Sequence, residues 1–113
     1  MKKFLVLYNA KGATFEKMMK NATPEMRDAS MQGWMKWMGD NKDSIVDPGA
    51  PVGKTKRIDA KGTTDVKNAV GGYSVIQAAT HAQAAKLFKK SHPHLQMPGT
   101  WVELVEIMPM PGG

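Results

Sequence analysis

Segment 100–108 most constrains the fold, because it predicts a strand with apolar side chains on both of its faces. These side chains divide into two rows: Trp101, Val105 and Ile107 on one face, and Val102, Leu104 and Met108 on the other. Successive side chains of a strand point to opposite faces of a sheet. A sheet that contains this strand must therefore be covered on both sides.

The remaining apolar patterns predict an α+β domain. Strands are expected over 4–8, from 44, over 54–59 and over 73–78, with helices over 24–41 and from 81. Segments 9–22 and 60–72 are read as loops, the first with one helical turn. The prolines after Asp47 confine the strand that begins at 44 to an edge or a bulge. The order β-α-β-β-α-β with an extra hairpin is the ferredoxin-like pattern, in which two helices cover one face of an antiparallel sheet.

Both helices have recognisable beginnings. Thr23, Pro24 and Glu25 supply a capping hydroxyl, a first-turn proline and an acid. Thr80 with Gln83 fits a capping box, and that helix is expected to end with Lys89 and Lys90, before Pro93.

The first helix carries two tryptophans and four methionines: Met26, Met31, Trp34, Met35, Trp37 and Met38. The favoured interpretation is that these side chains belong to the core and to a dimer contact. The alternative is that they form an adaptable wall of a ligand pocket. Since both helices lie on one face, a second copy of the sheet is the simplest cover for the other. We therefore predict a homodimer with its sheets face to face.

Length and composition exclude several classes of protein. The 113 residues predict one domain over 1–113 and contain no cysteine, which rules out disulfides and thiolate catalysis. The apolar run 4–8 is shorter than the roughly 7–15 residues of a signal-peptide core or the roughly 20 of a membrane span. We expect a cytoplasmic protein with no membrane partner.

The formal charge is +6, and basic residues gather at Lys54, Lys56, Arg57, Lys61 and Lys67. They could attract an anionic substrate or nucleic acid, but a solvated hairpin edge that blocks edge-to-edge pairing is the favoured interpretation. Binding of RNA on this type of sheet needs aromatic side chains on the central strands. Only Tyr8 and Tyr73 are available, near strand ends, so we predict no nucleic-acid partner.

Two of the three histidines fall in the segment His92-Pro93-His94-Leu95, where the last helix pattern ends. Histidine titrates closest to neutral pH, so this pair is the best candidate for proton chemistry. We predict His94 as a general base, Asp47 as the carboxylate that orients it and His92 as a second proton carrier, with Asp65 as an alternative orienter. Tyr8, Trp34, Met38 and Tyr73 would line the pocket.

A structural role is the competing interpretation, with His92 an exposed cation at a helix end and His94 packed against Pro98 and Trp101. A zinc site needs three or four ligands. The third histidine, His81, would lie about 16 Å from His92 along the predicted helix, too far to join the pair. Only a carboxylate such as Asp47 could complete such a set. We predict no metal, and no phosphate-binding glycine loop points to a cofactor.

The chain resembles YCII-related proteins of the dimeric α/β-barrel superfamily over essentially its whole length. The matching segments are Lys3 to Tyr8, Thr23 to Glu25, Val46 to Pro51, Gly72 to Ile76, His92 to Leu95 and Val102 to Pro109. The resemblance implies a dimerising ferredoxin-like fold and an enzyme with a histidine–aspartate dyad; one relative removes chloride from a chlorinated hydroxyquinol.

The dyad itself differs here. Gln32 stands near the position of the family histidine, and His92 occupies that of its aspartate. A subgroup motif, Asp-Gly-Pro-Phe, falls where this chain has Asp65-Val66-Lys67-Asn68. The sequence thus predicts a small dimeric enzyme that uses histidine and aspartate on a small aromatic or anionic molecule, and its alternative is a non-catalytic ligand-binding or regulatory module.

Overall fold

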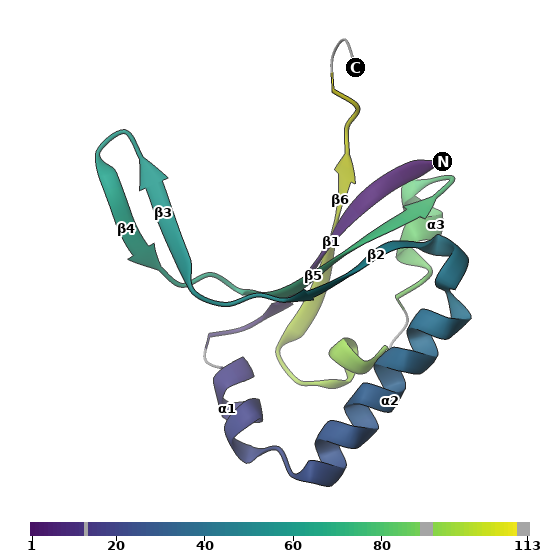
Figure 1. Cartoon of the computed structure of the whole chain (residues 1–113), viewed down its shortest axis with the longest axis horizontal. Helices are drawn as coiled ribbons and strands as arrows, with labels where there is room; N and C mark the ends of the chain where they lie inside the picture. The colour runs from purple at the N-terminus through teal and green to yellow at the C-terminus, as the bar shows by residue number, and fades with distance from the viewer. Residues whose placement is uncertain (13, 89–91, 111–113) are drawn as a thin grey trace.

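A four-stranded antiparallel sheet organises the chain in the computed structural model, which describes residues 1–12, 14–88 and 92–110 (Figure 1). The sheet has the order β2-β5-β1-β6, and a separate two-stranded sheet pairs β3 with β4. The elements are β1 (Lys2–Ala10), α1 (Thr14–Asn21), α2 (Pro24–Asp40), η1 (Lys42–Ser44), β2 (Ile45–Pro51), β3 (Thr55–Asp59), β4 (Gly62–Val66), β5 (Val70–Ala78), α3 (His81–Ala85), η2 (Pro93–Gln96) and β6 (Thr100–Ile107). Leaving out the β3–β4 hairpin, the order and pairing are those of the predicted ferredoxin-like pattern.

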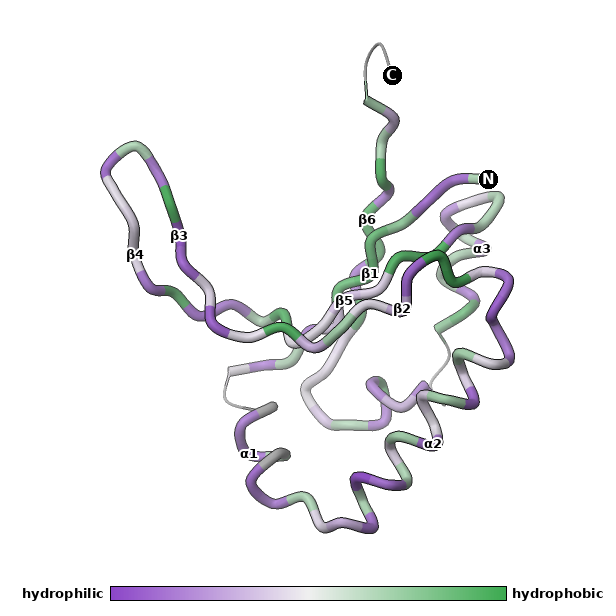
Figure 2. The backbone as a smooth tube through the Cα atoms, in the orientation of Figure 1, coloured by the Kyte–Doolittle hydropathy of each residue, from purple (hydrophilic) through white to green (hydrophobic). Residues whose placement is uncertain are grey.

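One face of the sheet holds the core. Phe4, Val6 and Tyr8 of β1 are buried and pair with Ile76, Ser74 and Gly72 of β5. Trp37 of α2 and Ala84 of α3 complete this buried cluster from above the sheet. Figure 2 shows hydrophobic residues gathered on the sheet strands, while α1 is mostly hydrophilic.

The opposite face of the sheet, which we call the outer face, is apolar but uncovered within the chain. Leu5 of β1 pairs with Val75 of β5 and Val105 of β6, so the three side chains share this face. On the same face of β6, Trp101, Val105 and Ile107 remain 37%, 46% and 43% exposed. The two apolar rows predicted for β6 therefore do lie on two faces, and the described residues cover only the face of Val102 and Leu104, while Met108 lies beyond β6 and is 69% exposed.

Both predicted helix starts are confirmed. The Thr23 hydroxyl accepts a hydrogen bond from the Met26 N–H at 3.1 Å, and the Thr80 hydroxyl accepts one from the Gln83 N–H at 3.1 Å. On α2, Trp37 is buried and Trp34 and Met38 pack partly against the core, whereas Met26, Met31 and Met35 are exposed. Only part of the predicted apolar surface is therefore core.

The second helix is shorter than predicted. α3 ends at Ala85, and the N–H groups of Leu87 and Phe88 bond to carbonyls three residues back, at 3.2 and 3.1 Å. The Leu87 carbonyl instead accepts a hydrogen bond from the Trp37 indole at 2.8 Å. This tertiary contact competes with continuation of the helix. The predicted end at Lys89 and Lys90 lies outside the described residues.

Two segments predicted as loops are regular structure. α1 occupies Thr14–Asn21, and β4 occupies Gly62–Val66. β3 pairs with β4 rather than with β2, because a tight turn follows Asp59, whose carboxylate accepts a hydrogen bond from the Lys61 N–H at 2.8 Å. β2 pairs with β5 at the sheet edge, which confirms the position that its prolines predict.

Candidate functional site

The segment His92-Pro93-His94 forms a capped turn against the core. His92 precedes η2, and its Nδ1 accepts a hydrogen bond from the His94 N–H at 3.1 Å, while Pro93 takes the first position of the turn. Both histidines are only 2% exposed. The interpretation of His92 as an exposed helix-end cation is therefore wrong.

His94 joins the turn to two strands. Its Nε2 lies 2.7 Å from the Asn9 carbonyl of β1 and 3.2 Å from the Trp101 carbonyl of β6. Both oxygens can only accept, so Nε2 carries the proton and donates to them, and Nδ1 holds the lone pair. Burial lowers the pKa of His94, and the two carbonyl bonds act against that shift. At neutral pH the ring is uncharged.

His92 stands among four aromatic rings. Trp34 and Trp37 present their rings nearly at right angles to it, with centroids 4.6 and 4.8 Å away, and Phe88 and Tyr8 lie at 5.4 and 5.8 Å. Because Nδ1 accepts a hydrogen bond, the neutral ring carries its proton on Nε2. That buried atom has no hydrogen-bond partner among the described residues. Burial, and then the charge of His94, lowers the pKa of His92 to about 4. At neutral pH this side chain is a donor held in an apolar surrounding.

Tyr8 belongs to the same cluster and extends it along the core face of the sheet. Its hydroxyl lies 3.0 Å from the Ser74 hydroxyl, which in turn donates to the Pro48 carbonyl at 2.8 Å. The single hydrogen of Ser74 is used by Pro48, so the Tyr8 hydroxyl donates to Ser74. Burial raises the pKa of Tyr8 to about 12.

Asp47 does not meet the histidines. It pairs with Val75 on β5, and its carboxylate accepts a hydrogen bond from the Gly49 N–H at 2.8 Å. Neighbouring strands are about 4.8 Å apart, so β2 lies about 10 Å from β1. Asp47 is also level with Leu5, four residues along β1 from the Asn9 carbonyl that His94 contacts. The alternative orienter, Asp65, is exposed on β4 and pairs with Lys56 at 2.7 Å.

One of the four predicted pocket residues is separated from the other three. Tyr73 pairs with Leu7 and lies on the outer face, whereas Tyr8 lies on the core face. Trp34 and Met38 pack against the core beside Tyr8. Ser74, Trp37 and Phe88, which the sequence did not single out as site residues, are the side chains that complete the cluster.

Other kinds of site find little support in the described part of the chain. Its buried polar side chains are Asn9, Ser74, His92 and His94, so no carboxylate there is buried. No group of three histidine, aspartate or glutamate side chains among those residues could hold a metal ion. Within the same residues, no helix combines the length and the apolar character needed to cross a membrane.

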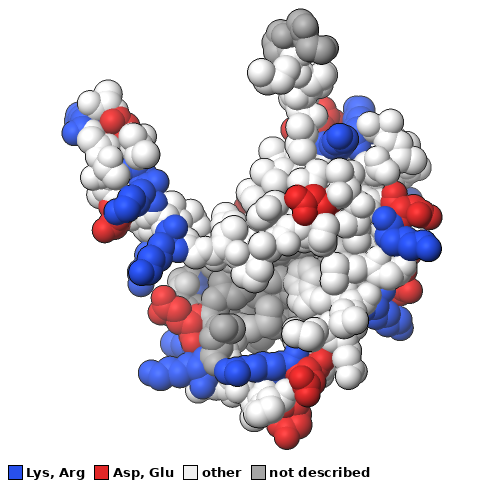
Figure 3. All heavy atoms as spheres, in the orientation of Figure 1, with Lys and Arg blue, Asp and Glu red and all other residues white. Residues whose placement is uncertain are grey.

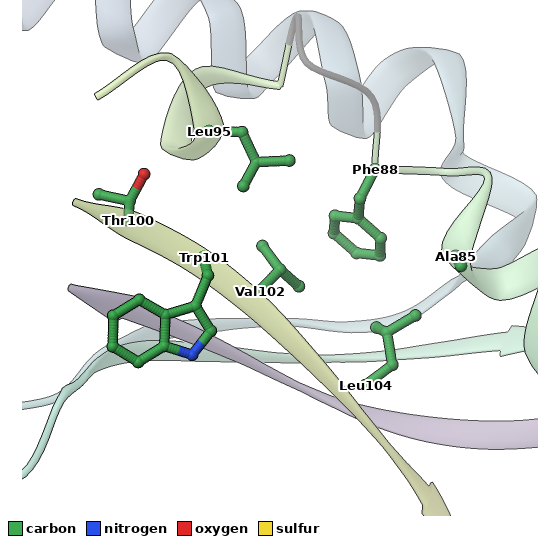
Figure 4. A pocket seen from close by; sticks show the side chains of 7 residues that line it. All are labelled: Ala85, Phe88, Leu95, Thr100, Trp101, Val102 and Leu104. Atoms are coloured by element: carbon green, nitrogen blue, oxygen red, sulfur yellow. The ribbon is translucent and has the colours of Figure 1, made fainter. Parts of the chain in front are cut away.

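A hollow of about 240 Å³ opens between β6, α3 and η2 (Figure 4). Its walls are Ala85, Phe88, Leu95, Thr100, Trp101, Val102 and Leu104. Phe88 lines the hollow and also contacts His92, with ring centroids 5.4 Å apart, so the hollow adjoins the cluster around the buried histidine. The Thr100 hydroxyl in this wall donates to nearby carbonyls, 2.7 Å from that of His94 and 2.6 Å from that of Met97.

Comparisons with known proteins give a structural likeness but no match in sequence. No family model and no curated protein sequence matches the chain. The structure is similar to that of 5-chloro-2-hydroxyhydroquinone dehydrochlorinase from Burkholderia phenoliruptrix AC1100, solved in complex with 2,5-dihydroxybenzoquinone. The TM-score is 0.49 and the sequence identity 15%, over 89% of this chain and 90% of that chain. The function proposed below therefore depends on this chain's own residues.

Proposed function

We propose that this protein binds a small aromatic molecule in the hollow between β6, α3 and η2. The supporting observation is the composition of the walls, which are apolar, include the ring of Phe88 and contain few polar groups. Ligand sites are typically concave and apolar, with a few polar groups that fix orientation. A volume of about 240 Å³ is below the roughly 300–1,000 Å³ of drug-sized sites, which favours a ligand of one ring.

The proposal includes a homodimer of the dimeric α/β-barrel type. Its support is the outer face, where Trp101, Val105 and Ile107 stay more than a third exposed in the single chain. Contiguous exposed apolar rows of this kind mark interaction surfaces. A second copy of the same face covers them by two-fold symmetry, in agreement with the resemblance to YCII-related proteins.

Acid–base catalysis is the second candidate function. It is favoured by the depressed pKa values of His92 and His94, which keep both rings neutral at physiological pH. His94 would be the base, and the bonds of its Nε2 to two strand carbonyls fix the orientation of its ring. Because no described carboxylate is buried beside the rings, the anionic partner of this chemistry would have to come from the ligand, in place of Asp47.

Fragment binding tests the first candidate. A set of single-ring phenols, quinones and benzoates is titrated into ¹⁵N-labelled protein, and we expect amide shifts at Ala85, Thr100, Val102 and Leu104. Ala85→Phe should fill the hollow and weaken binding at least tenfold. Ala82→Phe is the matched control, because Ala82 lies on the same short helix, is exposed and does not line the hollow. Equal binding by the two variants would contradict the proposal.

The same fragments separate binding from catalysis. Conversion of a bound compound, followed by mass spectrometry, should disappear in His94→Gln if His94 is the base, while binding persists. Bound compounds that stay unchanged with the wild-type protein, or turn over equally well with His94→Gln, would leave a binding protein and remove the catalytic role of His94.

A further inference from the structure

The hairpin β3–β4, which we call the arm, stands away from the rest of the chain. Thr55 and Val66 at its base are half-buried, and its other residues are exposed, with Ile58 at 77%. The two strands pack chiefly against each other. An isolated two-stranded hairpin is at best marginally stable in water. The structure thus presents an extended element that would gain stability from a surface to lie on.

The arm is predominantly basic. Between residues 54 and 67 there are five basic residues and two acidic ones. Lys56 pairs with Asp65 at 2.7 Å, and Arg57 lies 3.6 Å from Asp59. Lys54 and Lys61 take part in no ion pair among the described residues. Figure 3 shows the resulting line of basic side chains along the arm.

The arm and the end of β6 extend from the same side of the sheet. In Figure 1 both point away from α1 and α2, and the sheet strands lie between their bases. This is the side of the uncovered outer face. A strand advances about 3.3 Å per residue, so the five residues of β3 project about 17 Å. A molecule seated on the outer face is therefore within reach of the arm.

β6 offers the complementary charge. Its residues 100–107 include Glu103 and Glu106 and no basic side chain. Glu106 lies on the core face, where it pairs with Lys2 at 3.5 Å, so Glu103 is the acid that β6 presents on the outer face. Glu103 lies on the outer face and accepts a hydrogen bond from the Trp101 indole at 2.8 Å. β6 is also an edge strand of the four-stranded sheet, with one side left unpaired by other strands. The same chain thus carries a basic arm and, on the outer face of the β6 edge, the acid Glu103, and its own sheet separates the two.

We propose that the arm of each copy embraces the β6 edge of a second copy of this chain, in a reciprocal exchange. This inference depends on the proposed homodimer, which it deepens by naming the contacts at its rim. Two-fold symmetry makes the contact twice, once for each arm. Electrostatic complementarity at such a rim sets which surfaces meet and makes association sensitive to salt.

Sedimentation equilibrium at 50 mM salt tests the charge complementarity. K54E/K61E keeps both ion pairs within the arm and should raise the dissociation constant of the dimer at least tenfold. K17E/K20E is the matched control, because it makes the same change in charge on the exposed side of α1 and should change the constant less than twofold. Mixing K54E/K61E with E103K should restore association as a heterodimer.

Cross-linking tests the position of the arm. The chain contains no cysteine, so Ile58→Cys can carry a benzophenone maleimide at a single site. We expect light to join two chains, with the attachment mapped by mass spectrometry to residues 100–110 of the second chain in a mixture of ¹⁵N-labelled and unlabelled protein.

The outcomes distinguish the two proposals. A wild-type monomer at 100 μM, roughly a hundred times the concentration at which a micromolar dimer half forms, would overturn the dimer and the arm together. A wild-type dimer whose dissociation constant responds equally to K54E/K61E and K17E/K20E, with cross-links outside β6, would overturn the arm alone.

Discussion

The imidazole of His92 accepts a hydrogen bond from the backbone N–H of His94 through its Nδ1, over 3.1 Å. This bond fixes the tautomer of one ring, and the two strand carbonyls fix that of the other. The two histidines therefore close the turn between the helical layer and β6 in their uncharged forms. Any acid–base role would be added to this structural one, so substitutions must separate the two.

Stability should fall in acid because of His92. Burial lowers its pKa in the folded protein to about 4, from 6.5. Between these values the unfolded chain binds a proton that the folded chain does not, so the free energy of unfolding decreases as the pH falls. The loss is complete near pH 4 and amounts to about 3 kcal/mol for a shift of this size. Urea unfolding at intervals from pH 7.5 to 4 measures it.

His92→Asn is the control for that measurement. Asparagine is a good capping residue, and its side-chain oxygen can take the place of Nδ1 without titrating in this range. The free energy of unfolding of His92→Asn should be lower than that of the wild type, since the ring contacts with Trp34 and Trp37 are lost. Its stability should nevertheless vary less with pH over the same interval. A variant as pH-sensitive as the wild type would assign the effect to another group.

His94→Ala should destabilise the protein by about 3 kcal/mol, because it leaves two carbonyls without their buried donor and opens a cavity. His94→Gln can place an amide nitrogen near the position of Nε2 and donate to the Asn9 carbonyl, so it should recover about half of this loss. The comparison uses urea unfolding at pH 7.5, where the ring is neutral. Equal losses in the two variants would mean that ring packing, and not the bond to Asn9, provides the stability.

The strands and caps could be predicted from the sequence because their signals are local. Apolar residues on both faces give β6, a hydroxyl before each helix gives the starts of α2 and α3, and prolines place β2 at an edge. The loop predicted over 60–72 is wrong for Gly62–Val66, which form β4; the glycines of this segment favour a loop, but the threonines after Gly62 favour a strand. Local patterns also miss contacts between residues far apart in the sequence. The hydrogen bond from the Trp37 indole to the Leu87 carbonyl is such a contact, and it competes with a hydrogen bond that would continue α3.

The candidate site was only partly predictable for a related reason. His92 and His94 stand out in the sequence, and both are buried where a helix pattern meets the last strand. Their supposed partner, Asp47, was chosen by its place at a strand end. Strand order decides that pairing instead: two strand spacings separate β2 from β1. No local pattern gives this order, and the aromatic neighbours of His92 come from α2, β1 and the segment after α3.

Ser74→Ala should cost more stability than Tyr8→Phe. The Ser74 hydroxyl accepts a hydrogen bond from the Tyr8 hydroxyl and donates one to the Pro48 carbonyl. Its removal therefore leaves the Tyr8 donor and the Pro48 acceptor without a partner. We expect about 2–3 kcal/mol for Ser74→Ala and about 1 kcal/mol for Tyr8→Phe, which leaves only a hydroxyl without its donor. Thermal and urea unfolding of both variants provide the comparison. The reverse order would mean that the hydrogen of Ser74 points to Tyr8.

Gly49→Ala should displace β2 from the sheet. Gly49 has φ +75°, and a Cβ added there would lie 1.7 Å from the Tyr73 carbonyl oxygen, a contact that only movement of the backbone can relieve. The strained conformation and the clash together should cost more than about 3 kcal/mol, and the hydrogen bond from Ser74 to Pro48 should be lost with the strand.

Gly39→Ala is the matched control: Gly39 lies in α2 with no atom within 4 Å of an added Cβ, so alanine should stabilise by up to about 1 kcal/mol. Hydrogen exchange at the Val75 and Tyr73 amides, compared in the two variants, reports whether β5 has lost its partner. Unchanged protection in Gly49→Ala would show that β2 can accommodate the methyl group without leaving the edge.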